Sequence, residues 1–406
     1  MGPSGPAADL ALHETAKPTA RLSRLPAPPA WQAGLIILLV HGFYVLAAGP
    51  TTGQDSATYA RFAEQLASSG FDYAGQLAQV NSEFPAILYV LFVTLVALLQ
   101  LAFGDGWPIA LITLNLAADI GVGLLLLRLV GRATGSAAAS WGALLLFLAC
   151  FDLFQWVRYA LSDSTFVFIA FSIFALVAAR ILGDSRGWAR VIGLAGTGIF
   201  YRPTGFVLVP DLVWAAYLAR AGRFPIGRGP LLLLLGAAAA GGAFLFAWLI
   251  QDPQRWPFAM LARAFEVTAA GYSAGAVVDA RVETYHSPPS ALVDYVLISG
   301  DRFIHFFAPG AAGFSPAHWV AQLIFFLPCY ALAGWLLIAL WRSDTGFGQS
   351  EKKVFFASAG AVLAYAAFHG LVQVDFDWRY RAPILPHLIL LAAGGIADLE
   401  RRLRRT

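Results

Sequence analysis

Three acidic residues lie in polar segments beside long apolar runs, where a carboxylate can take part in acid–base chemistry. Asp55 opens one polar segment, Glu83 directly precedes an apolar run, and Asp163 lies at the mouth of another. A carboxylate that removes the proton of an acceptor hydroxyl accelerates a transfer by ~10²–10⁴-fold. Three carboxylates could also hold Mg²⁺ or Mn²⁺. Each acid has a structural alternative: Asp55 and Asp163 could cap helices, and Glu83 could form the polar edge of a buried helix.

Three arginines lie in similar places and could bind a phosphate. Arg202 lies in Tyr-Arg-Pro-Thr-Gly, between two short apolar runs, where an unpaired charge would be costly. Arg379 and Arg381 flank Tyr380 just before the last apolar run, a pattern that suits a phosphate at a membrane surface. The alternatives are a salt bridge that holds the Arg202 hairpin and an aromatic belt with ion-paired arginines.

The composition determines what kind of protein must position these residues. The chain has 406 residues, of which 59% are hydrophobic and 13% charged, and its mean hydropathy is +0.67. Soluble domains are ~45–50% apolar and ~25% charged, so a soluble enzyme and a disordered chain are both excluded. Two cysteines in apolar runs exclude a disulfide scaffold, and a net charge of +3 is too small for a nucleic-acid-binding surface. We therefore predict an all-α polytopic membrane protein.

A membrane span needs ~20 apolar residues, and basic loop residues decide the direction of each span. All the basic loop groups can face the cytoplasm only if one early run does not cross, and Phe84–Phe103 is the best candidate. We therefore predict about ten crossings with both termini inside. The predicted spans are Trp31–Gly49, Pro108–Leu127, Ala137–Phe151, Leu161–Leu182, Ala189–Phe200, Gly205–Leu218, Pro230–Ile250, His318–Trp341, Val354–Val372 and Pro383–Ala397.

The same pattern predicts how the chain is organised. Residues 1–30 read as a disordered cytoplasmic tail, 31–250 as a transmembrane module with an outer loop at 50–107, and 318–406 as C-terminal spans with a basic tail. The outer loop 251–317 could form a substrate lid, and His286 lies in its most polar patch. In the loop 50–107, a stripe at Tyr59, Phe62, Ala63 and Leu66 predicts a helix that starts with Asp55 at its N-cap.

Several short motifs, taken in order, resemble a known family. They are Gln-Asp55-Ser-x-x-Tyr59, Glu83-Phe84-Pro85, Arg128-x-x-Gly-Arg132, Leu161-Ser162-Asp163, Arg202-Pro203-Thr204-Gly205 and Arg379-Tyr380-Arg381-x-Pro383. This order resembles the lipid-dependent glycosyltransferases of the C superfamily, in particular the bacterial branch related to protein O-mannosyltransferases and to the aminoarabinose transferase of lipid A. The resemblance covers roughly residues 31–398. The Glu-Lys pair of the aminoarabinose branch is missing, because Phe84 follows Glu83, which argues against aminoarabinose as the donor sugar.

The resemblance implies a module of seven spans with two juxtamembrane helices in the first outer loop. It also implies inverting transfer of a sugar from a polyprenyl-phosphate donor to a glycan, lipid or protein acceptor. We expect Asp55 to act as the base, and Glu83 and Asp163 to orient the substrates or hold a divalent cation. Arg202, Arg379 and Arg381 would hold the phosphate, with Arg379 and Arg381 as a clamp at the surface and with Tyr59, Tyr380 and His286 in support. A phosphate leaving group held by arginines needs no strong acid, so we expect no essential metal.

Two other classes of protein remain open at this point. A transporter or flippase for a polyprenyl-linked glycan would also need arginines for the phosphate, but the paired broken helices typical of transporters are missing. A polymerase or ligase with a diphosphate-linked donor would need similar arginines without the Asp55 helix. The composition is rich in Ala, Arg and Gly and poor in Lys, which suggests a bacterial plasma membrane with the site on its outer face.

Overall fold

The computed structural model describes residues 26–75, 86–184, 188–220, 292–310, 313–372 and 378–406. Within these residues the chain is helical throughout, with one isolated β-bridge between Thr51 and Tyr159. The α-helices are α1 (Ala30–Ala48), α2 (Gln54–Ser68), α4 (Val90–Phe103), α5 (Trp107–Thr134), α6 (Ala137–Ala149), α7 (Phe151–Phe154), α8 (Asp163–Ile181), α9 (Trp188–Ile199), α10 (Leu208–Arg220), α13 (Leu292–His305), α14 (Pro316–Trp341), α15 (Gln349–Val372) and α16 (Leu385–Arg405). Short 3-10 helices include η3 (Ala86–Tyr89), η4 (Gly104–Gly106), η5 (Gln155–Arg158), η6 (Pro203–Val207) and η8 (Trp378–Ile384).

The ends of the long helices follow from local sequence signals. Helix α5 has Pro108 in its first turn, where a missing N–H costs nothing, and it stops at Gly135, which has a left-handed φ of 62°. Helix α6 starts at once because the Ser136 side chain accepts a hydrogen bond from the Ala139 N–H at 3.0 Å. The Ser315 side chain caps α14 in the same way, through the His318 N–H at 3.2 Å.

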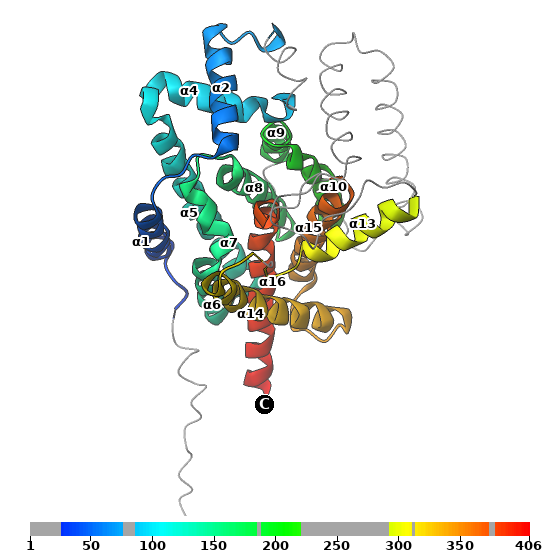
Figure 1. The fold of residues 1–406 in the computed structure, drawn as a ribbon. Coiled ribbons are helices and arrows are strands. Elements are labelled where there is room, and N and C mark those ends of the chain that lie inside the picture. Colours follow the sequence, from blue (N-terminus) through cyan, green and yellow to red (C-terminus); the bar gives the residue numbers. More distant parts are fainter. Residues whose placement is uncertain (1–25, 76–85, 185–187, 221–291, 311–312, 373–377) are drawn as a thin grey trace, which may run out of the picture.

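Helix α16 forms the centre of the molecule (Figure 1). Its residues from Leu385 to Gly395 are buried on every side, whereas a helix at the lipid boundary would expose one face. Helices α14, α15, α5 and α6 pack around it. The most C-terminal helix therefore completes a core whose other walls come from both halves of the chain.

Helices α1 and α5 run antiparallel. Gly34 near the start of α1 packs against Leu124, and His41 near its end is 2.5 Å from the Asp119 carboxylate, earlier in α5. The end of α1 and the start of α5 therefore lie at the same end of the bundle, and α2 and α4 connect them there. Helix α4 has 14 residues, or ~21 Å of helix, which is short of a ~30 Å hydrocarbon core. This arrangement agrees with the prediction that Phe84–Phe103 does not cross.

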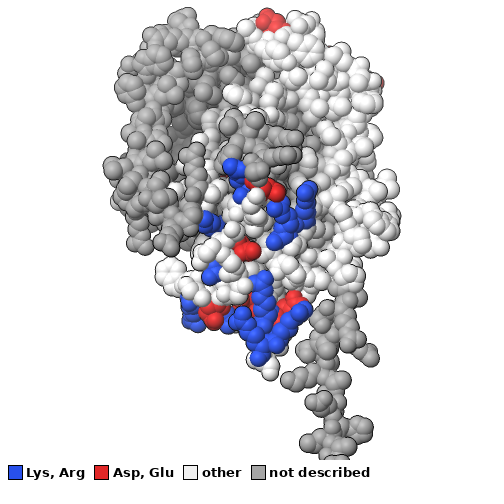
Figure 2. Space-filling view, turned by 180° about the vertical axis from the view of Figure 1, so that it is seen from behind, with Lys and Arg blue, Asp and Glu red and all other residues white. Residues whose placement is uncertain are grey.

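One end of the bundle collects basic residues from four parts of the chain, and we call it the basic end. Arg401 donates to the Thr134 carbonyl oxygen at 2.8 Å, Arg402 pairs with Asp344 at 2.9 Å, and Arg132 pairs with Asp184 at 2.7 Å. The start of α1 is here too, because Trp141 Nε1 donates to the Pro26 carbonyl at 2.9 Å. Figure 2 shows Lys and Arg concentrated toward this end. Those predicted cytoplasmic basic groups that the structure describes thus lie at one end of the bundle, as the sequence predicted.

The opposite end, which we call the site end, holds the end of α1 and the starts of α2 and α8. Arg158 ties these segments together, because its guanidinium donates to Thr51 Oγ1 at 2.7 Å and to the Ala48 carbonyl at 3.1 Å. The 19 residues of α8, or ~28 Å of helix, separate this end from Asp184. The two polar ends are therefore about one hydrocarbon thickness apart.

Six helical stretches among the described residues are long and apolar enough to cross a membrane, and the bent pair α6–α7 with η5 makes up to seven. The all-α, multi-pass membrane prediction is therefore confirmed, whereas the count of ten stays a prediction. Helices α9 and α10 are shorter than a full span, with 12 and 13 residues, and they form the expected hairpin with Arg202 at its tip. The predicted span Pro230–Ile250, the tail up to residue 25 and most of the predicted lid lie outside the described residues.

Candidate functional site

The first part of the site is the start of α2. The N-cap lies two residues earlier than predicted, at Gly53, whose N–H donates to Ser56 Oγ at 3.1 Å. Asp55 therefore lies in the first turn rather than at the cap, a position that also favours a negative charge. The predicted stripe of Tyr59, Phe62, Ala63 and Leu66 is buried, and Asp55 lies on the same face one turn before Tyr59, at the edge of the core. The Asp55 side chain is 41% exposed and pairs with Arg379 at 2.6 Å.

The second part is a buried ion pair between Asp163 and Arg202. Asp163 is the first residue of α8, and Arg202 is the extended residue that precedes η6. Their side chains are 3% and 5% exposed, and the Arg202 guanidinium donates to Asp163 Oδ1. Burial by itself lowers the pKa of Arg202, but the Asp163 carboxylate and the phenols of Tyr89 and Tyr380 together raise it, so the pKa lies above its ordinary value. Arg202 therefore stays charged at every physiological pH.

The turn that carries Arg202 depends on Gly205. A Cβ atom at this position would collide with the backbone carbonyl of Gly198, near the end of α9. The Gly205 N–H also donates to the Arg202 carbonyl oxygen at 2.8 Å, which closes a tight turn. The sequence Arg-Pro-Thr-Gly thus lets α9 and η6 approach closely, and the arginine points toward α8.

Tyr380 lies between the two ion pairs and connects them. Its ring centroid is 5.5 Å from the Arg202 guanidinium carbon and 5.4 Å from that of Arg379. Both distances fall within the range of cation–π contacts. Asp55, Asp163, Arg202, Arg379 and Tyr380 therefore form one continuous group of side chains at the site end, which we call the site cluster.

Aromatic residues form the floor of the site cluster. Tyr59 lies 5.4 Å from Tyr89 and 4.9 Å from Phe92 between ring centroids, and Phe92 lies 5.4 Å from Tyr201. The Tyr201 hydroxyl is 2.6 Å from Thr165 Oγ1, in the first turn of α8. Burial raises the pKa of Tyr59 well above its ordinary value of 10, and it also raises the pKa values of Tyr89 and Tyr201. These phenols therefore stay protonated and keep a hydroxyl hydrogen to donate.

Arg381 does not join the site cluster, and its predicted surface position is wrong. The side chain is buried, and its Nε donates to Asp152 Oδ2 at 2.6 Å. The same guanidinium donates to the Ala308 carbonyl and lies 4.5 Å from the Phe326 ring centroid. Neighbouring residues of a 3-10 helix point in directions about 120° apart, so residues 379 and 381 face different partners. Arg381 thus ties η8 to α7 and α14 instead of forming a clamp with Arg379.

Two predicted site residues, Glu83 and His286, lie outside the described residues, as does the lid around His286. Within the described ranges, no group of three or more His, Cys, Asp or Glu side chains is placed to hold a metal ion. Each described acid of the site cluster is instead paired with one arginine.

Three residues that help to hold the site were not assigned a role from the sequence. Asp152 is fully buried beneath Arg381, and Gln322 of α14 donates to the same carboxylate. Asn115 of α5 holds the loop before Asp163, because its amide donates to the carbonyls of Tyr159 and Leu161 at 2.9 and 3.3 Å. For Asn115 and Gln322 the available signal was a polar residue inside an apolar run, since such a residue needs a partner.

Comparisons of the chain with protein-family models, with curated proteins and with solved structures found no match. The site cluster therefore has to be interpreted from its own chemistry.

Proposed function

We propose that this chain is an integral-membrane inverting glycosyltransferase. It would move a monosaccharide from a polyprenyl-phosphate donor to an acceptor hydroxyl at the outer face of a bacterial plasma membrane. The observation that carries the proposal is the convergence of Asp55, Asp163, Arg202 and Arg379, which are far apart in sequence, around Tyr380 at one end of the bundle. The family resemblance of the ordered motifs supports it as well.

The two ion pairs of the site cluster suit different tasks because they differ in exposure. Arg202 and Asp163 are buried and hold each other in place, so the positive charge of Arg202 is fixed before a substrate arrives. A fixed charge stabilises a developing anion without reorganisation during the reaction. Arg379 is partly exposed, with 20% of its side chain accessible, and can turn from Asp55 to an incoming phosphate. Arginine suits this role because its planar fork can bind two phosphate oxygens.

Donor binding would thereby prepare the base. In the structure Asp55 Oδ2 accepts a hydrogen bond from Arg379, so this oxygen is occupied. Once the guanidinium turns to the donor phosphate, the oxygen can accept the proton of the acceptor hydroxyl. The hydroxyl oxygen then bonds to the anomeric carbon, the bond from that carbon to the phosphate oxygen breaks, and polyprenyl phosphate leaves with the electron pair. Inversion follows because the nucleophile and the leaving group occupy opposite faces of the sugar.

The direct test is sugar transfer from a labelled polyprenyl-phosphate donor by the purified protein in lipid. We expect Asp55→Asn to reduce transfer at least ~10²-fold, since that is the contribution of a general base. Glu64→Gln is the matched control, because Glu64 is an exposed acid on the same helix. Equal activity of the wild type and Asp55→Asn would remove Asp55 from the mechanism. Tight donor binding without turnover across several donor sugars would favour a transporter instead.

A further inference from the structure

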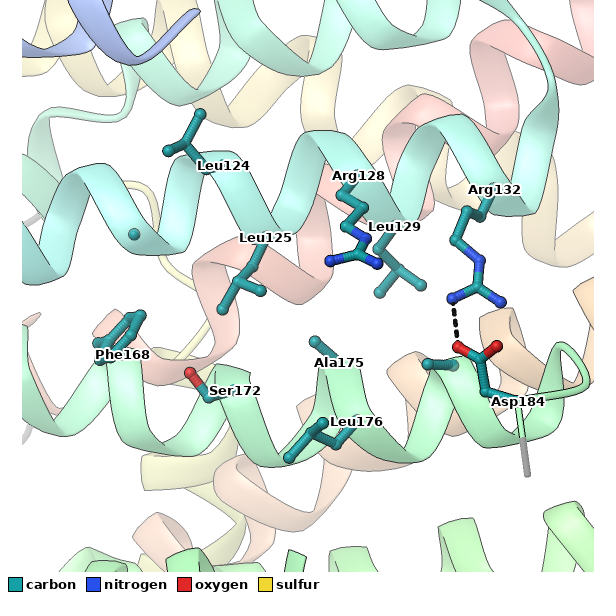
Figure 3. A pocket seen from close by; sticks show the side chains of 12 residues that line it. Leu124, Leu125, Arg128, Leu129, Arg132, Phe168, Ser172, Ala175, Leu176 and Asp184 are labelled. Carbon is teal, nitrogen blue, oxygen red and sulfur yellow. Dashed lines mark hydrogen bonds and ion pairs between the residues drawn. The ribbon is translucent and has the colours of Figure 1, made fainter. Parts of the chain in front are cut away.

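A groove at the other end of the bundle is unrelated to the site cluster. It lies between α5 and α8, has a volume of about 950 Å³, and is lined by four leucines and other mostly apolar residues together with two arginines and an aspartate. Figure 3 shows the facing side chains of the two helices, with Leu125 and Arg128 on α5 opposite Phe168 and Ala175 on α8. We call this feature the α5–α8 groove.

The shape of the α5–α8 groove follows from the sizes of its residues. Near the middle of the bundle the helices touch, because a Cβ atom at Gly121 would lie 2.6 Å from the Phe168 ring. Farther along α8, Ala175 and Ala179 replace the large side chain, and the space between the helices stays open toward the basic end. From Gly121 to Arg128 the apolar wall runs ~10 Å along the helix, within the ~15 Å thickness of one hydrocarbon leaflet.

The open end of the groove carries an excess positive charge. The Arg132 guanidinium donates a hydrogen bond to the Asp184 carboxylate at 2.7 Å. Arg128 makes no hydrogen bond or ion pair with any described residue, and in Figure 3 its guanidinium projects into the space between the helices. Two arginines and one aspartate among the lining residues leave one net positive charge. A single unpaired guanidinium at the mouth of an apolar groove matches a ligand with one negative charge and an apolar tail.

We propose that the α5–α8 groove binds a phospholipid with a monoanionic phosphodiester headgroup, whose phosphate contacts Arg128 and whose acyl chain lies against the leucines. The basic end of the bundle is the side that basic residues place in the cytoplasm, and anionic lipids attract basic residues at that surface. The Ser172 hydroxyl, which lines the groove deeper than Arg128, has no hydrogen-bond partner among the described residues. An ester carbonyl of the bound lipid would give this hydroxyl an acceptor.

The test compares lipid retention in native mass spectra of the purified protein after exchange into phosphatidylglycerol or phosphatidylcholine. We expect phosphatidylglycerol to stay bound to the wild type and Arg128→Gln to bind it about tenfold more weakly, since one hydrogen bond to a charged group is lost. Arg404→Gln is the matched control, because this arginine is exposed at the same end but does not line the groove. Ala175→Leu provides a second variant that fills the groove and leaves every charge in place, and it should also reduce retention.

Three results would overturn the proposal. Equal retention of phosphatidylglycerol by the wild type and both groove variants would show that the lipid binds elsewhere. Equal retention of phosphatidylcholine would show that the headgroup charge plays no part. Inorganic phosphate that binds the wild type and Ala175→Leu equally, and that releases no lipid, would identify an anion site without a lipid. None of these readouts depends on the activity proposed for the site cluster.

Discussion

At the scale of single residues, the molecule separates two kinds of ion pair. The pair of Asp163 and Arg202 is buried, and removing one partner leaves an uncompensated charge that costs ~3–5 kcal/mol. The pair of Asp55 and Arg379 is partly exposed and contributes only ~0–1 kcal/mol. Loss of Asp163 should therefore lower stability, whereas loss of Asp55 should lower activity with little effect on stability.

The first prediction contrasts these two acids. Asp163→Asn should lower the unfolding midpoint of the purified protein markedly, whereas Asp55→Asn should leave it nearly unchanged while transfer is lost. Thermal unfolding in detergent, followed by tryptophan fluorescence, measures both. The double variant Asp163→Asn/Arg202→Met should recover part of the loss, because no unpaired charge remains. An equal loss of stability in the two single variants would contradict the proposed division of tasks.

The second prediction concerns alkaline pH. Burial raises the pKa of Tyr59 in the folded state above its ordinary value of 10. As pH rises through ~10, the unfolded chain loses this proton while the folded chain keeps it, so stability falls. Between about pH 8 and about pH 11, the free energy of unfolding should fall less steeply for Tyr59→Phe than for the wild type. Parallel curves for the two proteins would show that Tyr59 ionises in the folded state as it does in the unfolded chain.

At the scale of elements, local patterns could be predicted and long-range pairings could not. The stripe on α2 fixed which face is buried, because helical periodicity depends only on neighbouring residues. The hairpin tip at Arg202 was also predictable, since two short apolar runs flank a turn sequence. The destination of Arg381 was not, because its partner Asp152 lies 229 residues away and nothing local distinguishes it from Arg379. Arg379 and Arg381 have different partners because their positions on η8 point in different directions.

The third prediction tests the close approach of α9 and η6. Gly205→Ala should force the turn away from the Gly198 carbonyl and destabilise the protein by ~1–3 kcal/mol, the usual cost of overpacking. Because the same turn presents Arg202, transfer activity should fall more than the loss of folded protein explains. Gly196→Ala is a suitable control, since a Cβ atom there meets nothing within 4 Å. Full activity of folded Gly205→Ala would show that the turn does not position Arg202.

At the scale of the whole molecule, charge is sorted between two ends that lie one membrane thickness apart. The sequence predicted this sorting from loop composition alone, because basic residues are retained on the cytoplasmic side. The exact set of crossings is harder to predict, since α9 and α10 are too short for a hydropathy window and the chain bends by 55° between α6 and α7. The buried position of α16 could not be predicted from its sequence, because a helix that faces lipid and a helix that faces protein can both be apolar.

The fourth prediction tests which end faces outward. Both natural cysteines, Cys150 and Cys329, are buried, so an impermeant thiol reagent should not reach them in intact cells. The reagent should label Ser68→Cys at the site end and should not label Ser343→Cys, in the turn after α14 at the basic end. Permeabilised cells provide the control, because both variants should then be labelled. Labelling of Ser343→Cys alone in intact cells would invert the proposed orientation.

The buried contact between Arg381 and Asp152 has a consequence for biosynthesis. The chain is made from its N-terminus at ~5–20 residues per second, so the 229 residues between the partners take roughly 10–45 s to synthesise. During that time Asp152 has no Arg381 with which to pair, and Asp55 has no Arg379. The first half of the protein therefore carries uncompensated acids until η8 has been synthesised. A nascent chain released before residue 378 would keep them, which gives quality-control proteases a feature that distinguishes incomplete copies from finished ones.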